Sequence, residues 1–148
     1  MMMLLFSFWF AGIDGIAQFI TKPTNTQFTI PSSGGGTTAS SPKFSCEIDF
    51  ETSGDELEWY AYGAGGVETL ISRGSLVQTE YAQTYYVIVS GGEVTLNLQV
   101  GFITLQSPTK YECRSQFTPV ITAAASVIIF GTYVSWRQNV QVHARGET

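Results

Sequence analysis

The sequence predicts an all-β fold in which two sheets pack face to face. Apolar and polar residues alternate over residues 43–50, around Cys46, which is the period-2 pattern of a strand with one buried face. Trp59 occupies an apolar position in the next segment of this kind, and Tyr111 shares the face of Cys113. Two strands that lie far apart in the sequence therefore each direct a Cys side chain inward, and a third directs a Trp side chain inward.

This arrangement resembles the immunoglobulin fold, which places a Cys on one strand, a Trp on the next and a Tyr-x-Cys motif on a later strand. The long separation between the two Cys leaves room for an additional hairpin, so the resemblance is to variable-type (V-set) domains. It implies a Greek-key sandwich with one inter-sheet disulfide, Cys46 to Cys113, and a core around Trp59, Leu98 and Tyr111. The alternative for the two Cys is a pair of buried free thiols, as in a cytosolic protein.

One departure from the family pattern bears on the lineage. The family usually has an Asp six residues before the second Cys, paired with an Arg, but here Ser107 stands at that position and Pro108 follows it. The resemblance is therefore to a divergent lineage, not to an antibody or a T-cell receptor. Variable-type domains with such atypical motifs look similar to invertebrate recognition receptors, including allorecognition proteins that bind their own kind.

Composition narrows the classes of partner. The chain has 148 residues, which fits one domain, and its 13% charged and 14% aromatic residues suit a β-rich globular protein. The formal net charge is −5 and no basic cluster occurs, so we do not expect binding to nucleic acid or to an anionic membrane surface. The resemblance to recognition receptors implies that the partner is another protein, either a different one or a second copy of this chain.

Residues 1–17 are interpreted as a secretory signal peptide. Their core, residues 3–10, is apolar except for Ser7, and Gly15 and Ala17 are small residues at the two cleavage positions. No Lys or Arg precedes the core, so a buried N-terminal strand and an uncleaved anchor are the alternatives. Together with a disulfide, a signal peptide predicts a protein that is secreted or lies on the extracellular side of the plasma membrane.

The strands can be placed in order along the chain. Residues 18–30 are expected to hold a first strand that Pro23 interrupts, and residues 31–42 form a flexible loop rich in Gly, Ser and Thr. Glycines at 63–66 and 91–92 indicate tight turns between strands. The remaining strands are expected at residues 43–50, 57–62, 67–72, 76–81, 85–90, 93–100 and 110–114.

The C-terminal part allows two interpretations, because residues 117–136 carry no charge and are long enough to span a bilayer. We favour an apolar connection with strand character around residues 126–134, followed by a last strand at 136–142. A membrane span would remove that strand and leave an open sheet edge beside Cys113. The domain is then expected at residues 18–144, with 145–148 beginning a linker and membrane attachment in a downstream segment; the alternative is a complete small secreted protein.

No motif of the sequence indicates catalysis, a metal or a cofactor. The single histidine, His143, lies near the C-terminus, and no Cys/His cluster of the zinc-binding kind occurs. Four acidic residues gather near one loop without the spacing of a calcium-binding loop, and solvated carboxylates explain them better. These are Asp49, Glu51, Asp55 and Glu56. We therefore do not expect an enzyme.

The outer face of one sheet is the candidate binding surface. Its residues combine tyrosines with charged groups, as protein interfaces often do. They are Glu58, Tyr60, Tyr62, Glu112 and Arg114. Glu58 and Arg114 carry opposite charges that can pair either across strands within one copy or between two copies. No Asn-x-Ser/Thr sequon would place a glycan over the face.

The function predicted on this basis is extracellular protein–protein recognition. The domain would be a module of a cell-surface receptor or adhesion protein, homophilic if the likeness to allorecognition proteins extends that far. The alternative is a soluble secreted immune-type effector or decoy. A transmembrane segment downstream of this chain would separate the two.

Overall fold

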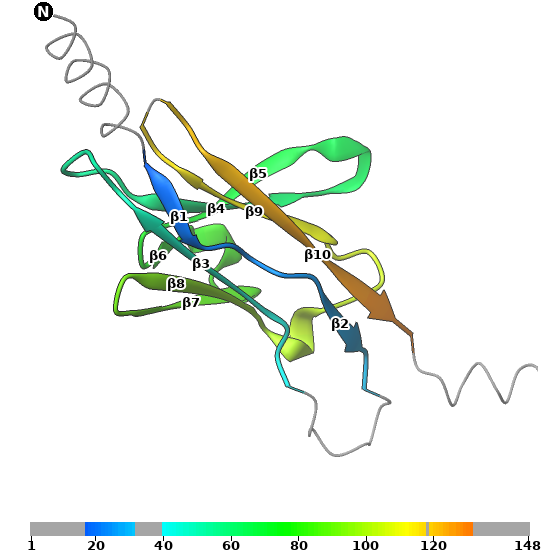
Figure 1. Cartoon of the computed structure of the whole chain (residues 1–148). Helices are drawn as coiled ribbons and strands as arrows, with labels where there is room; N and C mark the ends of the chain where they lie inside the picture. Colours follow the sequence, from blue (N-terminus) through cyan, green and yellow to red (C-terminus); the bar gives the residue numbers. More distant parts are fainter. Residues whose placement is uncertain (1–16, 32–39, 118, 132–148) are drawn as a thin grey trace, which may run out of the picture.

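The structure, a computed structural model, describes residues 17–31, 40–117 and 119–131 and contains ten strands (Figure 1). The strands are β1 (Gln18–Thr21), β2 (Thr26–Thr29), β3 (Lys43–Asp49), β4 (Leu57–Tyr62), β5 (Glu68–Arg73), β6 (Leu76–Val77), β7 (Tyr85–Ser90), β8 (Glu93–Leu98), β9 (Lys110–Ser115) and β10 (Thr122–Phe130). Three short 3-10 helices, η1 (Ala64–Gly66), η2 (Thr79–Tyr81) and η3 (Val100–Phe102), lie in the connections.

The strands form two sheets. One has the order β1-β3-β8-β7, and the other has the order β2-β10-β9-β4-β5-β6. Neighbouring strands are antiparallel except for β10 and β2, which run parallel. This is the sandwich that the sequence predicts, and β5 and β6 supply the additional hairpin of variable-type domains.

The first strand changes sheets where the sequence predicts an interruption. Pro23 lies between β1, which pairs with β3 in one sheet, and β2, which pairs with β10 in the other. Proline has no backbone N–H to donate to a ladder and therefore favours a break in the strand. The N-terminal segment thus contributes an edge strand to both sheets.

The core lies between the sheets and is centred on the predicted disulfide. Cys46 on β3 and Cys113 on β9 are bonded across the sandwich, with their Cα atoms 6.6 Å apart, and neither is exposed. Trp59 is directly opposite Cys113 in the β4–β9 ladder and is also fully buried. Leu98 and Tyr111 are buried as well, which confirms the predicted core.

Tyr111 has a different partner from the one the family pattern suggests. A tyrosine at this position usually bonds to nearby backbone. Here its hydroxyl lies 3.0 Å from the hydroxyl of Tyr85, the first residue of β7, with the rings 5.9 Å apart edge to face. Burial raises the pKa of both phenols, so both remain neutral in the folded protein. The paired hydroxyls join β7 to β9 across the sandwich.

Two predicted strands extend too far. The strand placed at 93–100 ends at Leu98, because the chain turns into η3 at Val100. The strand placed at 76–81 covers only Leu76 and Val77, and η2 follows. The turn between β7 and β8 is as predicted: Gly91 and Gly92 have φ of 59° and 92°, a conformation that glycine adopts without strain.

Among the described residues, the strand that pairs with β9 lies earlier in the chain than predicted. β10 pairs with β9, from Thr122 opposite Arg114 to Ser126 opposite Lys110, and so occupies the place assigned to residues 136–142. The strand character expected around 126–134 belongs to this strand. Its side chains are small or apolar on both faces, which removes the alternation that would have identified it.

Several predictions concern residues outside the described ranges. The signal peptide (except Ala17), the middle of the loop at 31–42, the strand at 136–142, His143 and the linker at 145–148 all fall there. They remain predictions, as does the domain boundary at residue 144.

Candidate functional site

The outer face of the six-stranded sheet carries a connected set of aromatic and charged side chains on β4, β5 and β9. We call it the tyrosine face. Strand alternation places alternate residues of β4 on this side, while Leu57, Trp59 and Ala61 point into the core. The tyrosine face comprises Glu58, Tyr60, Tyr62, Glu68, Arg73, Glu112 and Arg114.

Arg114 lies at the centre of the tyrosine face. Its Nη1 is 2.7 Å from Oε1 of Glu68, and its Nη2 is 2.8 Å from Oε1 of Glu112. The guanidinium carbon lies 3.5 Å from the ring centroid of Tyr60, a stacked cation–π contact. Partial burial opposes the positive charge, but the two carboxylates outweigh it and raise the pKa of Arg114. The side chain is therefore a fixed cation.

Glu58 is held by an arginine that is not among the five predicted binding residues. Arg73 on β5 donates from Nε and places Nη2 2.7 Å from Oε2 of Glu58. The hydroxyl of Tyr60 donates to the other carboxylate oxygen at 3.1 Å. Arg114 is directly opposite Glu58 in the ladder but pairs elsewhere, so the Glu58–Arg114 ion pair does not form within one copy. Pairing of the two residues between copies stays a prediction. The choice of partner follows from the register of β5 against β4.

Tyr62 links the two carboxylates that hold Arg114. Its hydroxyl donates to Oε2 of Glu112 at 2.8 Å and accepts a bond from Nη2 of Arg114 at 3.3 Å. Burial, the bond to Glu112 and the negative charges of Glu112 and Glu68 raise the pKa of Tyr62 to about 12. The bond from Arg114 lowers the pKa of Glu68. Lys110 covers the ring of Tyr62, with Nζ 4.5 Å from the centroid.

The structure brings all five predicted binding residues together, but they are less exposed than an open sheet face would leave them. Glu58 is only 4% exposed and Glu112 only 9% exposed, because the neighbouring long side chains lie over them. The glutamates therefore support the tyrosines and Arg114 from below. Glu68, Arg73 and Lys110 belong to the same network. Alternation along β5 and β9 is the signal for Glu68 and Lys110, whereas Arg73 has the opposite parity to Glu68 and faces outward only because the register of β5 against β4 shifts.

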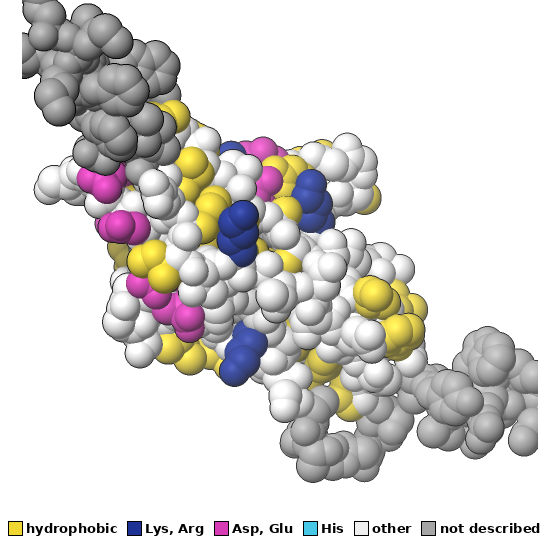
Figure 2. All heavy atoms as spheres, viewed as in Figure 1, with side chains coloured by type: hydrophobic (Ala, Val, Ile, Leu, Met, Phe, Trp, Pro, Cys, Tyr) yellow, Lys and Arg dark blue, Asp and Glu magenta, His cyan; other side chains and the backbone are white. Residues whose placement is uncertain are grey.

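Two flanking regions differ in character from the tyrosine face. On the adjacent β10, the outward residues Thr122, Ala124 and Ser126 are small and exposed, which leaves the side of Arg114 open. Hydrophobic side chains gather instead where β10 ends, as Figure 2 shows. Ile128, Phe130 and Leu105 are 53%, 47% and 61% exposed there.

The apolar segment after β9 does not stand free of the sandwich as an exposed patch. Ala125 and Val127 of β10 are buried in the core, and Ile129 packs against it. Only the outward half of the segment remains accessible. The segment therefore completes the sheet first, and the outward residues of its strand flank the tyrosine face.

The acidic loop has a structural role that its sequence does not reveal. Oδ1 of Asp55 accepts backbone N–H bonds from Glu56, Gln116 and Phe117, at 2.9, 2.9 and 3.2 Å. It thereby ties the loop before β4 to the chain after β9. Among the described residues, no group of three or more His, Cys, Asp or Glu side chains is arranged to hold a metal ion. None of the helices described is both long and apolar enough to cross a membrane.

Comparison with known proteins identifies the fold. No protein-family model matches the sequence, and no curated protein matches it. Solved structures do match. The DIP-gamma IG1+IG2 structure aligns with a TM-score of 0.62 and 13% identity, over 80% of this chain and 50% of that one. This chain thus spans about half the length of the DIP-gamma chain.

Two further neighbours are single immunoglobulin domains. The structure of Dpr1 IG1 bound to DIP-eta IG1 aligns with a TM-score of 0.60 and 12% identity, over 77% of this chain and 95% of that one. The RIG-5 IG1 homodimer aligns with a TM-score of 0.53 and 10% identity, over 76% and 96%. Sheet order, disulfide and neighbours agree: the chain has the immunoglobulin fold.

Proposed function

We propose that this chain is an extracellular protein–protein recognition module of a cell-surface receptor or adhesion protein, and that it binds through the tyrosine face. The observation that carries the proposal is the stack of Arg114 on Tyr60, at 3.5 Å, braced by Glu68 and Glu112. Tyrosine and arginine dominate the energetics of many protein interfaces. Here both are ordered before any partner arrives, which reduces the entropy lost on binding.

A second copy of this chain fits the tyrosine face for an electrostatic reason. Each of its three carboxylates contacts an arginine of the same chain. The main cost of burying ions is a charge left without a partner. When this face is buried against an identical one, few charges are left in that state. A two-fold axis that runs along β9, which lies between β10 and β4, would set the tyrosine rings of one copy against the small residues Thr122 and Ala124 of the other.

Two further observations support an extracellular recognition role. The disulfide requires an oxidising compartment, which is the surroundings of secreted and cell-surface proteins. Among the structural neighbours, Dpr1 IG1 is bound to DIP-eta IG1, and RIG-5 IG1 is a homodimer. Immunoglobulin folds host many functions, so the tyrosine face, more than the fold, is the basis of the proposal.

The test measures self-association of the purified domain. Light scattering after size exclusion, at several concentrations, gives the mass, and coated beads report aggregation. Tyr60→Ala and Tyr62→Ala are the variants, and Tyr86→Ala, a partly buried tyrosine on β7 of the other sheet, is the matched control.

We expect both face variants to lose association while the control keeps it, with melting temperatures that show all three fold. Wild-type protein that stays monomeric at every concentration would exclude the second copy as partner. Association that survives both face variants would place the interface elsewhere on the domain.

A further inference from the structure

A cavity of about 210 Å³ lies between the sheets, away from the tyrosine face. Ala61, Ile71 and Tyr85 form its buried floor, and Gly63, Tyr81 and Pro108 form much of its partly exposed wall. Ala61 and Thr69 are opposite each other on β4 and β5 and point to the inner side of these strands, whereas Tyr60 and Tyr62 point to the outer side. The two sites are therefore separated by the six-stranded sheet.

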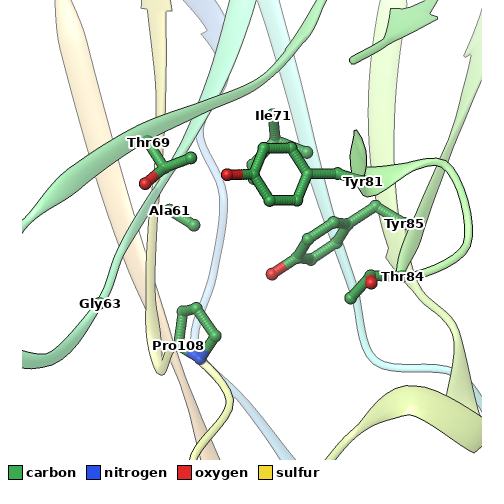
Figure 3. Close-up of a pocket in the computed structure, with 8 residues that line it drawn as sticks. All are labelled: Ala61, Gly63, Thr69, Ile71, Tyr81, Thr84, Tyr85 and Pro108. Atoms are coloured by element: carbon green, nitrogen blue, oxygen red, sulfur yellow. The ribbon is translucent and has the colours of Figure 1, made fainter. Parts of the chain in front are cut away.

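The cavity exists because the small residues on one side do not fill the space in front of the tyrosines on the other, and no strand of the described residues covers this side of the sandwich. Ala61 on β4 and Gly63 just after its end leave space, and Tyr81 and the first residue of β7, Tyr85, stand opposite. Figure 3 shows the rings of Tyr81 and Tyr85 near each other, with the hydroxyl of Tyr81 directed toward Thr69 and the hydroxyl of Tyr85 directed into the space between Ala61 and Pro108. β6 is only two residues long, so this side of the sandwich is not sealed by a continuous ladder.

The lining defines the chemistry of a ligand. None of the residues around the cavity is charged, so nothing there would neutralise an ion. Apolar side chains and tyrosine rings form most of the surface, while Thr69 and Thr84 add hydroxyl groups at the rim. Cavities of about 150 Å³ with apolar walls accept a benzene ring, so this volume admits a ring of phenol or indole size.

We propose that this cavity binds a small neutral aromatic molecule that carries one hydrogen-bonding group. The ring packs on Ala61, Ile71 and Pro108, and the polar group meets the hydroxyl of Tyr81. The hydroxyl of Tyr85 is already bonded to that of Tyr111 at 3.0 Å, which fixes the ring that forms the far wall. The site is independent of the proposed recognition surface, and either proposal can fail alone.

The experiment uses the purified chain with phenol and indole as probes and benzoate as a charged control of similar size. Saturation-transfer NMR gives binding, and melting temperature as a function of probe concentration gives an independent affinity. We expect saturable binding of indole and phenol, with Kd below about 1 mM, and none of benzoate.

Three variants test the location. Ala61→Leu fills the cavity, Thr69→Trp covers its mouth from a partly exposed position, and Leu76→Ala is a control at a residue that is 75% exposed on nearby β6. We expect the first two to weaken indole binding at least tenfold and the control to leave it unchanged. If Ala61→Leu does not fold, Thr69→Trp alone decides the question.

Three results would overturn the proposal. They are absence of saturable binding to the wild type at 10-fold the expected Kd (about 10 mM), equal binding to the wild type and both blocking variants, and binding of N-acetyl-tryptophanamide without binding of free indole. The last would show that the cavity takes a ring presented on a peptide instead of a small molecule.

Discussion

Replacing Arg114 tests whether the tyrosine face is a fixed structure. The contact with Glu112 joins two mostly buried side chains, with 17% and 12% exposed, and we assign it about 1.5 kcal/mol. The contact with Glu68, which is 41% exposed, is screened by water and adds about 0.5 kcal/mol. Stacking on Tyr60 contributes about 1 kcal/mol. Arg114→Ala should therefore lower the free energy of unfolding by about 3 kcal/mol.

Thermal unfolding followed by circular dichroism measures this change. A loss of about 3 kcal/mol corresponds to a melting temperature lower by about 10 °C for a domain of this size. Arg114→Lys retains the charge but loses the planar stack and the two-pronged contact, so we expect about half of the effect. A melting temperature for Arg114→Ala within about 3 °C of the wild type would refute the reasoning, because the network would then be solvated and unimportant for stability.

Three further predictions concern other parts of the molecule. Replacing Cys46 or Cys113 by Ala should cost about 2–5 kcal/mol, and peptide mapping without reduction should recover the two residues in one linked fragment. Gly92→Ala should lower the free energy of unfolding by about 1–2 kcal/mol, because φ is +92° there. Gly101→Ala is the control and should not destabilise the domain, because an added Cβ meets no atom within 4 Å and φ is not positive. Denaturant unfolding compares the two variants. The pKa of Tyr62 is raised to about 12, so its contribution to stability is complete below about pH 10, the unfolded pKa, and is lost as pH rises toward 12. The pKa values of Tyr60, Tyr85 and Tyr111 are also raised, so absorbance titration should find several late phenols in the wild type and one fewer in Tyr62→Phe; an equal number in both would contradict this.

The sequence was sufficient for the core because burial there follows simple alternation. Cys46, Trp59 and Cys113 each stand in a strand with one apolar face, and the structure joins them as predicted. β10 was misplaced for the opposite reason: its outward residues include Ala124 and Ile128, so both faces look apolar and no period is visible. The sequence does not reveal the strand ends at Leu98 and Val77, because a 3-10 helix begins two residues after each and short helices leave little pattern.

The sequence predicts which residues share the tyrosine face, but not which of their side chains pair with one another. Parity along β4 and β9 is enough to put Tyr60, Tyr62 and Arg114 on one face. Their partners depend on how β5 aligns with β4, and the register shifts between Trp59 and Tyr60. That irregularity brings Arg73 opposite Glu58. Such a shift has no signature in a single sequence, so the pairing required coordinates.

The parallel pairing of β2 with β10 has a mechanical consequence. β1 begins and β10 ends at opposite ends of the sandwich (Figure 1). A force that pulls these ends apart would draw β2 along β10, loading the pairs from Thr26–Val127 to Thr29–Phe130 simultaneously and parallel to the strands. Bonds loaded together resist as a group, whereas bonds at the end of a hairpin open one after another. The domain should therefore bear tension between its two ends without losing its last strand first.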